Sequence, residues 1–374
     1  MAVLKILAAL FIFGIIIMIH EFGHFLVAKW MKVRVNEFAI GMGPKLISWG
    51  KGETTYSLRL LPIGGFCAME GEDDGALTPT AMGGNAGRET DAGSGSGSLL
   101  DKPVWRRILI VVAGAFMNLV LGFCVLLCAF AFCVPKMSDG VAYFNSTTIA
   151  ELPETAKSYQ TGLRPGDTIL KVDGKSIATD MDLSMILQSD EDGVFDMTVR
   201  RDGERVALSG VTFELKNDEE SGMRYLQYDF KVLGIPRTFL STVKQAAKME
   251  YSMTVMVWRS LGDLISGRYG LNDLSGPVGT VDYIGDAVSA AVTQAGWRSL
   301  LMMVALITIN VGVFNLLPLP AQDGGRLLFL IIEGVTRKRI PPKYEGILHF
   351  VGLILLFLLM IVVTFSDIRK LIGG

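Results

Sequence analysis

Three residues near the N-terminus have the types and the spacing of a metal site. His20, Glu21 and His24 occur in the sequence His-Glu-Phe-Gly-His. On a helix, residues i and i+4 share a face, so both imidazoles can bind one zinc ion. Glu21 lies beside them and can take a proton from a zinc-bound water. The chain has only three histidines, so the pattern is rare by chance and predicts a zinc-dependent hydrolytic site.

A catalytic zinc ion needs a third protein ligand and an open position for water. Asp323 is the leading candidate, because it follows a long apolar run and precedes a glycine pair that lets the backbone approach a metal closely. Pro318 and Pro320 would break a helix just before it. A broken helix at membrane depth is tolerated only where it lines a cavity or is buried in protein. His349, the only other histidine, is the alternative ligand.

Four apolar runs predict four membrane-spanning helices. They cover about 3–31, 108–134, 300–319 and 347–365, in a chain whose mean hydropathy is +0.43. Each run is long enough to cross about 30 Å of hydrocarbon as a helix. The alternative is a set of buried soluble helices, but these rarely run so long without charge. The first two residues of the predicted metal motif, His20 and Glu21, therefore lie in or at the end of a membrane span.

Charge placement predicts the topology. Lys and Arg are frequent between the first and second runs and between the third and fourth, so the positive-inside rule places both loops in the cytoplasm. Both termini and the long segment from 136 to 297 then face outward. The net charge of −2 gives no indication of nucleic-acid binding. None of the four cysteines lies in the exported segment, so we expect no disulfide framework and no cysteine zinc site.

The segments between the runs differ in character. Short strands are expected at 35–40, 46–49, 56–61 and 66–69, followed by a Gly-, Ser- and Thr-rich linker. The exported segment begins with β-like runs separated by turns, which predicts a small α+β unit. Residues 237–265 have apolar residues on one helical face and could lie along the membrane surface.

Together these features resemble the bacterial site-2 proteases, in the regulator-of-sigma-E branch that cleaves anti-sigma factors. The resemblance covers essentially the whole chain. Its motifs are HEFGH at 20–24, PIGGF at 62–66, SGPVG at 275–279 and NLLPLPAQDGG at 315–325. In addition, GLRPGDTILKVDG at 162–174 is similar to a PDZ domain, of which this chain has one.

The resemblance implies roles for individual residues. Zinc is the implied cofactor, held by His20, His24 and Asp323, with Glu21 as the catalytic base. Asn315 is implied to hold the substrate backbone. The strands around PIGGF imply a membrane-associated hairpin that binds an unwound substrate segment by strand addition. The hairpin residues expected to contact substrate are Tyr56, Leu58, Leu60, Gly64 and Gly65.

Two positions depart from the pattern of the family. Gln322 stands immediately before Asp323, where the family usually has Leu, and Ala115 stands where the family usually has Pro. Neither change removes a ligand or the base. Gln322 does place a hydrogen-bonding group beside the predicted metal ligands, where it could alter their alignment.

The expected fold is an α-helical polytopic membrane protein with four transmembrane helices, a membrane-associated β-layer and an inserted α+β PDZ domain. The expected segments are a first transmembrane helix at 1–31, β-strands at 32–70, a cytoplasmic linker at 71–103, a second transmembrane helix at 104–135, an extracytoplasmic PDZ domain at 136–235, an amphipathic helical connector at 236–296, a third transmembrane helix with the Asp-Gly motif at 297–325, a cytoplasmic loop at 326–345, and a fourth transmembrane helix at 346–374.

The expected reaction is zinc-assisted hydrolysis of a peptide bond within the transmembrane segment of a single-span protein, in the bacterial cytoplasmic membrane. The resemblance implies substrates already cut once by another protease, such as anti-sigma factors, or remnant signal peptides. One alternative is a non-catalytic membrane scaffold that uses its PDZ domain, which loss of Glu21 or of a ligand would have favoured. Another is a peripheral metalloprotease, whose metal motif would lie outside a spanning segment.

Overall fold

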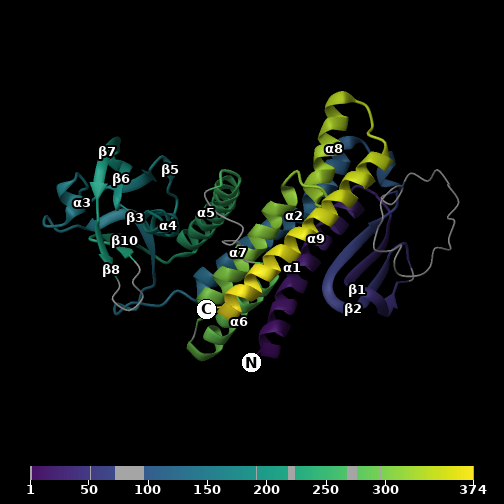
Figure 1. Cartoon of the computed structure of the whole chain (residues 1–374), viewed down its shortest axis with the longest axis horizontal. Helices are drawn as coiled ribbons and strands as arrows, with labels where there is room; N and C mark the ends of the chain where they lie inside the picture. The colour runs from purple at the N-terminus through teal and green to yellow at the C-terminus, as the bar shows by residue number, and fades with distance from the viewer. Residues whose placement is uncertain are drawn as a thin grey trace. The chain divides into compact units, whose positions relative to one another are not determined.

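The computed structural model describes residues 2–50, 52–71, 97–190, 192–217, 224–267, 276–294 and 296–373. Most of the predicted linker at 71–103 lies outside the described residues. The chain forms two compact units, one made of Met1–Val125 and Val257–Gly374 and the other of Leu126–Met256. Figure 1 shows the chain coloured from the N-terminus to the C-terminus.

The first unit is mainly helical. Its elements are α1 (Ala2–Trp30), a 3-10 turn (Leu99–Asp101), α2 (Val104–Phe132, whose end belongs to the second unit), α6 (Pro277–Gln294), α7 (Trp297–Leu316), α8 (Asp323–Thr336) and α9 (Pro342–Gly373). Among the described residues, four stretches are helical, long and apolar enough to cross a membrane: Lys5–Trp30, Val104–Phe132, Trp297–Leu316 and Tyr344–Arg369. These correspond to the four predicted runs.

Helix α6 ties the ends of two of these helices together. Lys5 of α1 lies 3.2 Å from Asp282 and 2.5 Å from Asp286, both on α6. At the start of α6, the backbone N–H groups of Gly276 and Gly279 donate to the carboxylate of Asp367 on α9, at 3.2 and 2.9 Å. Because a helix N-terminus favours negative charge, the buried Asp367 stabilises this junction. The segment 236–296, predicted as one helical connector, contains two helices, α5 (Phe239–Ile265) and α6.

The segment 297–325, predicted as the third transmembrane helix, is interrupted before Asp323, as Pro318 and Pro320 indicate. Helix α7 stops at Leu316, and a new helix, α8, begins at Asp323. The segment 326–345, predicted as a loop, therefore contains most of α8. Its apolar residues recur at helical spacing, although the basic cluster that follows them is typical of a loop. Helix α8 ends at Arg337, whose left-handed backbone (φ 56°) closes the last turn.

Two long irregular strands, β1 (Val35–Trp49) and β2 (Thr55–Met69), form the β-layer. Their register divides each of them into two halves, because Phe38 lies opposite both Cys67 and Tyr56, while Tyr56 also lies opposite Trp49. The four segments therefore follow the order 65–69, 35–40, 55–58 and 47–49 across the sheet. These segments correspond to the four short strands predicted from the sequence.

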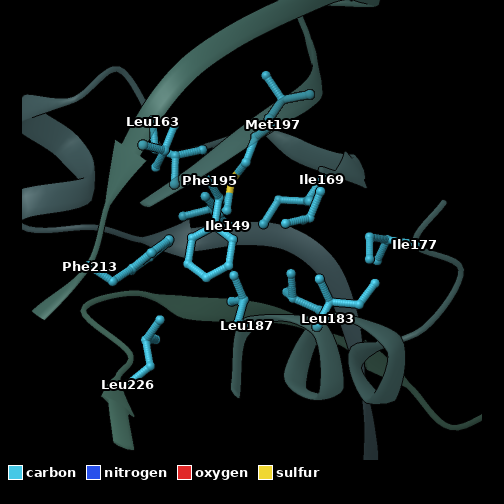
Figure 2. Close-up of a cluster of buried hydrophobic side chains, with 14 of the residues drawn as sticks. Ile149, Leu163, Ile169, Ile177, Leu183, Leu187, Phe195, Met197, Phe213 and Leu226 are labelled. Atoms are coloured by element: carbon cyan, nitrogen blue, oxygen red, sulfur yellow. The ribbon is translucent and has the colours of Figure 1, made fainter. Parts of the chain in front are cut away.

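The second unit is an α+β structure. Its strands are β3 (Tyr143–Glu151), β4 (Thr168–Val172), β5 (Lys175–Ser176), β6 (Val194–Arg201), β7 (Glu204–Thr212), β8 (Glu214–Asn217), β9 (Arg224–Gln227) and β10 (Lys231–Pro236), with helices α3 (Lys157–Gln160) and α4 (Asp180–Gln188). The main sheet has the order β10-β3-β4-β6-β7, with β5 paired to β4. Figure 2 shows its core, in which Ile169 and Phe195 from the sheet meet Leu187 of α4. Its assignment as a PDZ domain stays a prediction.

Candidate metal centre

Helix α1 presents both histidines of the motif on one face. His20 and His24 are each only 7% exposed, and they face the middle of α2. Gly23 makes this approach possible, because a Cβ atom there would overlap the carbonyl oxygen of Ala113 and lie 2.7 Å from Cγ of Met117. The glycine within the motif therefore sets the distance between α1 and α2.

Asp323 completes a cluster of three possible ligands. Its Oδ2 atom lies 2.9 Å from Nε2 of His20 and 3.2 Å from Nε2 of His24. The two Nε2 atoms are themselves 3.2 Å apart. A tetrahedral zinc ion bound at about 2.0–2.1 Å would separate its ligands by roughly 3.4 Å. The triangle is thus slightly smaller than a metal-loaded one and has the right shape and donor types.

Hydrogen bonding alone does not explain this convergence. Oδ2 of Asp323 is buried and has no hydrogen bond of normal geometry within the described part of the chain, although two ring nitrogens lie close to it. Buried carboxylate oxygens are normally saturated, since an unpaired one is costly. Two imidazole nitrogens and a carboxylate oxygen this close together are a donor set that fits a shared cation. The residues present therefore fit zinc.

The outer nitrogen of each ring has its own partner on α2. Nδ1 of His24 lies 2.8 Å from the carbonyl oxygen of Ile110, which can only accept, so Nδ1 carries the proton and Nε2 is left with a lone pair. Nδ1 of His20 lies 3.3 Å from Nδ2 of Asn118, whose Oδ1 is buried without a partner. Turning the Asn118 amide over would let its Oδ1 accept from Nδ1–H of His20, which would give His20 the same tautomer as His24. Such outer partners orient metal-binding imidazoles.

Sequence reasoning gave no role to Gly114 and Asn118, two residues of α2 that lie against the imidazoles. A Cβ atom on Gly114 would overlap Nε2 of His24 and lie 2.7 Å and 2.8 Å from the Cε1 atoms of His24 and His20. The absence of a side chain there leaves room for the two rings. Asn118 had a recognisable signal, because an amide within the apolar run of the second span is costly and usually functional.

The turn before Asp323 gives its glycine pair a different role from the predicted one. A Cβ atom on Gly324 would overlap the carbonyl oxygen of Leu317, and one on Gly325 would lie 2.5 Å from the carbonyl oxygen of Leu319. The glycines therefore let the first turn of α8 pack against the preceding backbone, rather than against a metal. This packing brings Asp323 back toward α1.

A cavity of about 520 Å³ opens beside the cluster. Its lining includes Glu21, His24 and Asp323 together with Phe66 of β2. A Cβ atom on Gly65 would lie 3.5 Å from Cγ of Glu21, so the end of β2 passes close to the predicted base. A peptide held along this part of β2 would lie next to the three ligand atoms.

The other predicted substrate residues are less close. Asn315 donates from its amide to the carbonyl oxygen of Val311 at 3.0 Å and is not among the residues that line the cavity. Tyr56 and Leu58 lie on the inner segment 55–58, which is paired on both sides, so they are not placed for strand addition. Leu60 is 54% exposed. Of the predicted hairpin contacts, Gly65 is the one that lies beside Glu21; Gly64 next to it packs on Met42.

The remaining sequence candidates have clear positions. His349 is outside the ligand cluster, since its Nδ1 accepts a hydrogen bond from the backbone N–H of Ala321 at 2.9 Å. Gln322 is the N-cap of α8 without a side-chain capping bond, and it lines the cavity. Ala115 is completely buried, and its carbonyl oxygen lies 3.1 Å from the Cβ position of Gly312 on α7.

The chain is similar to known proteins over nearly its whole length. Residues 8–359 match the model of Peptidase family M50. The chain is 31% identical to the Regulator of sigma-W protease RasP of Bacillus subtilis, over 99% of this chain and 100% of that protein. It is 30% identical to the Zinc metalloprotease RasP of Oceanobacillus iheyensis, over 98% of this chain and 99% of that protein.

Proposed function

We propose, from the premise that the chain belongs to Peptidase family M50, that its buried cluster is the zinc site of an intramembrane protease. The chain is a zinc metalloprotease of the site-2 protease family. The assigned ligands are His20, His24 and Asp323, and the assigned base is Glu21. The observation that carries the proposal is the meeting of two imidazole nitrogens and Oδ2 of Asp323 at 2.9–3.2 Å from one another. That oxygen is buried and has no normal hydrogen bond among the described residues.

Each residue has a separate task in the hydrolysis. His20, His24 and Asp323 would hold a zinc ion, which when bound would supply the Lewis acidity that polarises the scissile carbonyl and acidifies the attacking water. Glu21 accepts the proton of the attacking water and later delivers it to the leaving amine. Ile110 and Asn118 hold the imidazoles with Nε2 directed inward. The turn from Leu317 to Asp323 fixes the carboxylate.

The substrate segment must be extended when it is cut. In a helix, its carbonyls are engaged in hydrogen bonds, so a transmembrane helix has to unwind before a carbonyl can reach the site. We assign the part of β2 at 65–69 as the strand along which the unwound segment lies, because Gly65 adjoins Glu21 and Phe66 lines the cavity. Asn315 stays a candidate clamp, which would have to release the carbonyl of Val311 to bind substrate.

The proposed substrates are transmembrane segments of single-span proteins in the bacterial cytoplasmic membrane, after a first cut by another protease. The name of the Bacillus subtilis relative, which refers to sigma-W regulation, supports membrane-bound regulators as one substrate class. The basic loops support an orientation with both termini and the unit at 136–235 outside. We assign that unit as a PDZ domain that acts as a steric filter against untrimmed substrates.

The test is co-expression with a panel of tagged single-span membrane proteins, comparing the wild type with Glu21→Gln. The proposal expects cleavage within a transmembrane segment, mapped by mass spectrometry of the product ends, only with the wild type. Products cut outside transmembrane segments, or equal cleavage by both proteins, would reject it. Deletion of 140–233 tests the filter separately: untrimmed substrates should become cleavable, and continued rejection of them by a folded, zinc-loaded deletion variant would exclude the filter.

A further inference from the structure

His349 on α9 is the third histidine of the chain, and the proposed reaction leaves it without a role. Its ring lines the same cavity as Glu21 and Asp323. Nδ1 accepts a hydrogen bond from the backbone N–H of Ala321 at 2.9 Å. A backbone amide can only donate, so Nδ1 carries no proton. The ring is therefore neutral, and its single proton is on Nε2.

The orientation of this ring is fixed from several directions. Ala321 holds a left-handed backbone (φ 67°), which directs its N–H toward α9. The ring of Phe329 packs against the imidazole at 6.1 Å between centroids and 62° between planes. A Cβ atom on Gly325 would lie 3.4 Å from Cε1 of His349. Close packing of Gly352 against Pro320 holds α9 against the same turn.

The Nε2–H group is thus a fixed donor that no described residue accepts from. Nε2 is buried and has no hydrogen-bond partner within the described residues. The nearest carboxylate oxygen recorded for it, Oε1 of Glu345, is 3.9 Å away, which is too far for a hydrogen bond. An unpaired buried donor is costly, so a ligand that supplies an acceptor would remove this cost. Because Nε2 has almost no accessible surface of its own, the ligand reaches it only when the side chains around it shift.

We propose that His349 is a substrate-binding residue, whose Nε2–H donates a hydrogen bond to a backbone carbonyl of the peptide segment in the cavity. An extended peptide next to the metal exposes carbonyls, and these are acceptors without a proton of their own. The inference rests on the proposed function, because it requires a peptide in this cavity. It assigns α9 a direct part in holding the segment beside the ligand cluster.

Two substitutions distinguish the acceptor role of Nδ1 from the donor role of Nε2. His349→Asn places an amide oxygen near the position of Nδ1, so it keeps an acceptor for Ala321 but has no donor at the position of Nε2. His349→Gln places an amide NH₂ near the position of Nε2, so it restores the donor. Zinc content and thermal stability are measured for both variants in the full-length, detergent-purified protein.

Two zinc-binding probes give a readout that does not depend on turnover. Acetohydroxamate binds the metal alone, whereas a peptidyl hydroxamate also presents backbone carbonyls to the cavity. We expect His349→Asn to weaken the peptidyl compound about tenfold, the size of one hydrogen bond, and to leave acetohydroxamate unchanged. His349→Gln should recover most of this loss per bound zinc. For a reporter that the wild type cleaves, KM should rise more than kcat falls in His349→Asn.

A ligand-side experiment keeps the test valid even where a variant does not fold. Replacing the carbonyls of the peptidyl hydroxamate one at a time by CH₂ should cost the wild type about tenfold at one position. The proposal is overturned if no position shows such a loss, if His349→Asn binds the peptidyl compound as tightly as the wild type does, or if it weakens both hydroxamates equally. Failure of the proposed function is seen separately, as cleavage that persists in Glu21→Gln.

Discussion

Two carboxylates, Asp167 in the second unit and Asp323 in the first, differ in how fully they are hydrogen-bonded. In the second unit, Asp167 is completely buried and accepts from the backbone N–H of Arg164 at 2.9 Å and from the guanidinium of Arg201 at 2.7 and 2.8 Å. In the first unit, Oδ2 of Asp323 has two imidazoles within 3.2 Å but no normal hydrogen bond. A saturated carboxylate stabilises its own fold, whereas an unsaturated one is available to a ligand.

The same contrast holds for another carboxylate of the second unit. Asp182 accepts from the backbone N–H groups of Ala178 and Thr179 and from the hydroxyl of Ser252 on α5. These bonds cap α4 and join it to α5. Asp167 and Asp182 are thus buried with structural partners, and burial by itself does not mark a functional carboxylate.

Removing the proposed base should have the largest effect. Glu21→Gln keeps the shape of the side chain but cannot accept a proton at neutral pH, so we expect cleavage to fall by at least about 10²–10⁴-fold, while zinc content is unchanged. Cleavage of a co-expressed reporter and metal analysis measure the two quantities. Glu53→Gln, a change at an exposed glutamate of the β1–β2 turn, serves as the control and should leave both unchanged.

Removing each of the two carboxylates in turn tests the comparison directly. Asp323→Ala should lose most of the bound zinc and the activity together, because a site with two histidines alone is weak. Asp167→Ala should keep the zinc, but should lower the free energy of unfolding of the second unit by about 3 kcal/mol, since Arg201 loses its carboxylate partner and the backbone N–H of Arg164 loses its acceptor.

Metal analysis and thermal unfolding of the two purified variants distinguish these outcomes. The comparison fails if Asp323→Ala retains a full zinc complement, or if Asp167→Ala is the variant that loses it.

A methyl group beside the imidazoles should have an intermediate effect. Gly114→Ala pushes a Cβ atom against both rings, so we expect zinc affinity to fall on the order of tenfold, as when the outer support of a metal ligand is lost. Gly262→Ala on α5 meets no atom within 4 Å and is the matched control. Competition with a chelator measures both affinities. Equal affinities in the two variants would show that the rings do not need the space above Gly114.

The parts of the candidate site that depend on local spacing can be predicted from the sequence. The i, i+4 pair of His20 and His24 lies on one face of α1, and the helix break before Asp323 follows from its prolines. The position of Asp323 against α1 can be inferred only from the combination of the two motifs.

Contacts between segments far apart in the chain could not be predicted. The pairing of 35–40 with two different parts of β2 places Tyr56 on an inner segment, although its strand is predicted. Gly114 and Asn118 on α2 contact the imidazoles of α1, which are 90 residues or more away in sequence. The periodicity of one sequence carries no information about contacts over such a distance. For the same reason, the sequence suggests His349 as a possible ligand and gives no sign of its bond to Ala321.

The smallest predicted effect is a pH dependence of stability at Glu250 on α5. Burial raises the pKa of this carboxyl to about 7. The unfolded chain loses the proton near pH 4.5, so between pH 4.5 and 7 the folded state binds more protons, and stability falls as pH rises through this window. Glu250→Gln should remove this decline. Unfolding midpoints across the window measure it, and identical profiles for the two proteins would contradict the assignment.

The most direct test of the central claim is zinc X-ray absorption on the purified protein, compared with Asp323→Ala. The account predicts one zinc per chain, with two imidazole nitrogens and carboxylate or water oxygens at about 2.0–2.2 Å. In Asp323→Ala, the carboxylate contribution should disappear together with most of the metal. A wild-type spectrum with sulfur ligands or a third imidazole, or an unchanged spectrum and zinc content in Asp323→Ala, would contradict the assignment of this cluster as the catalytic centre.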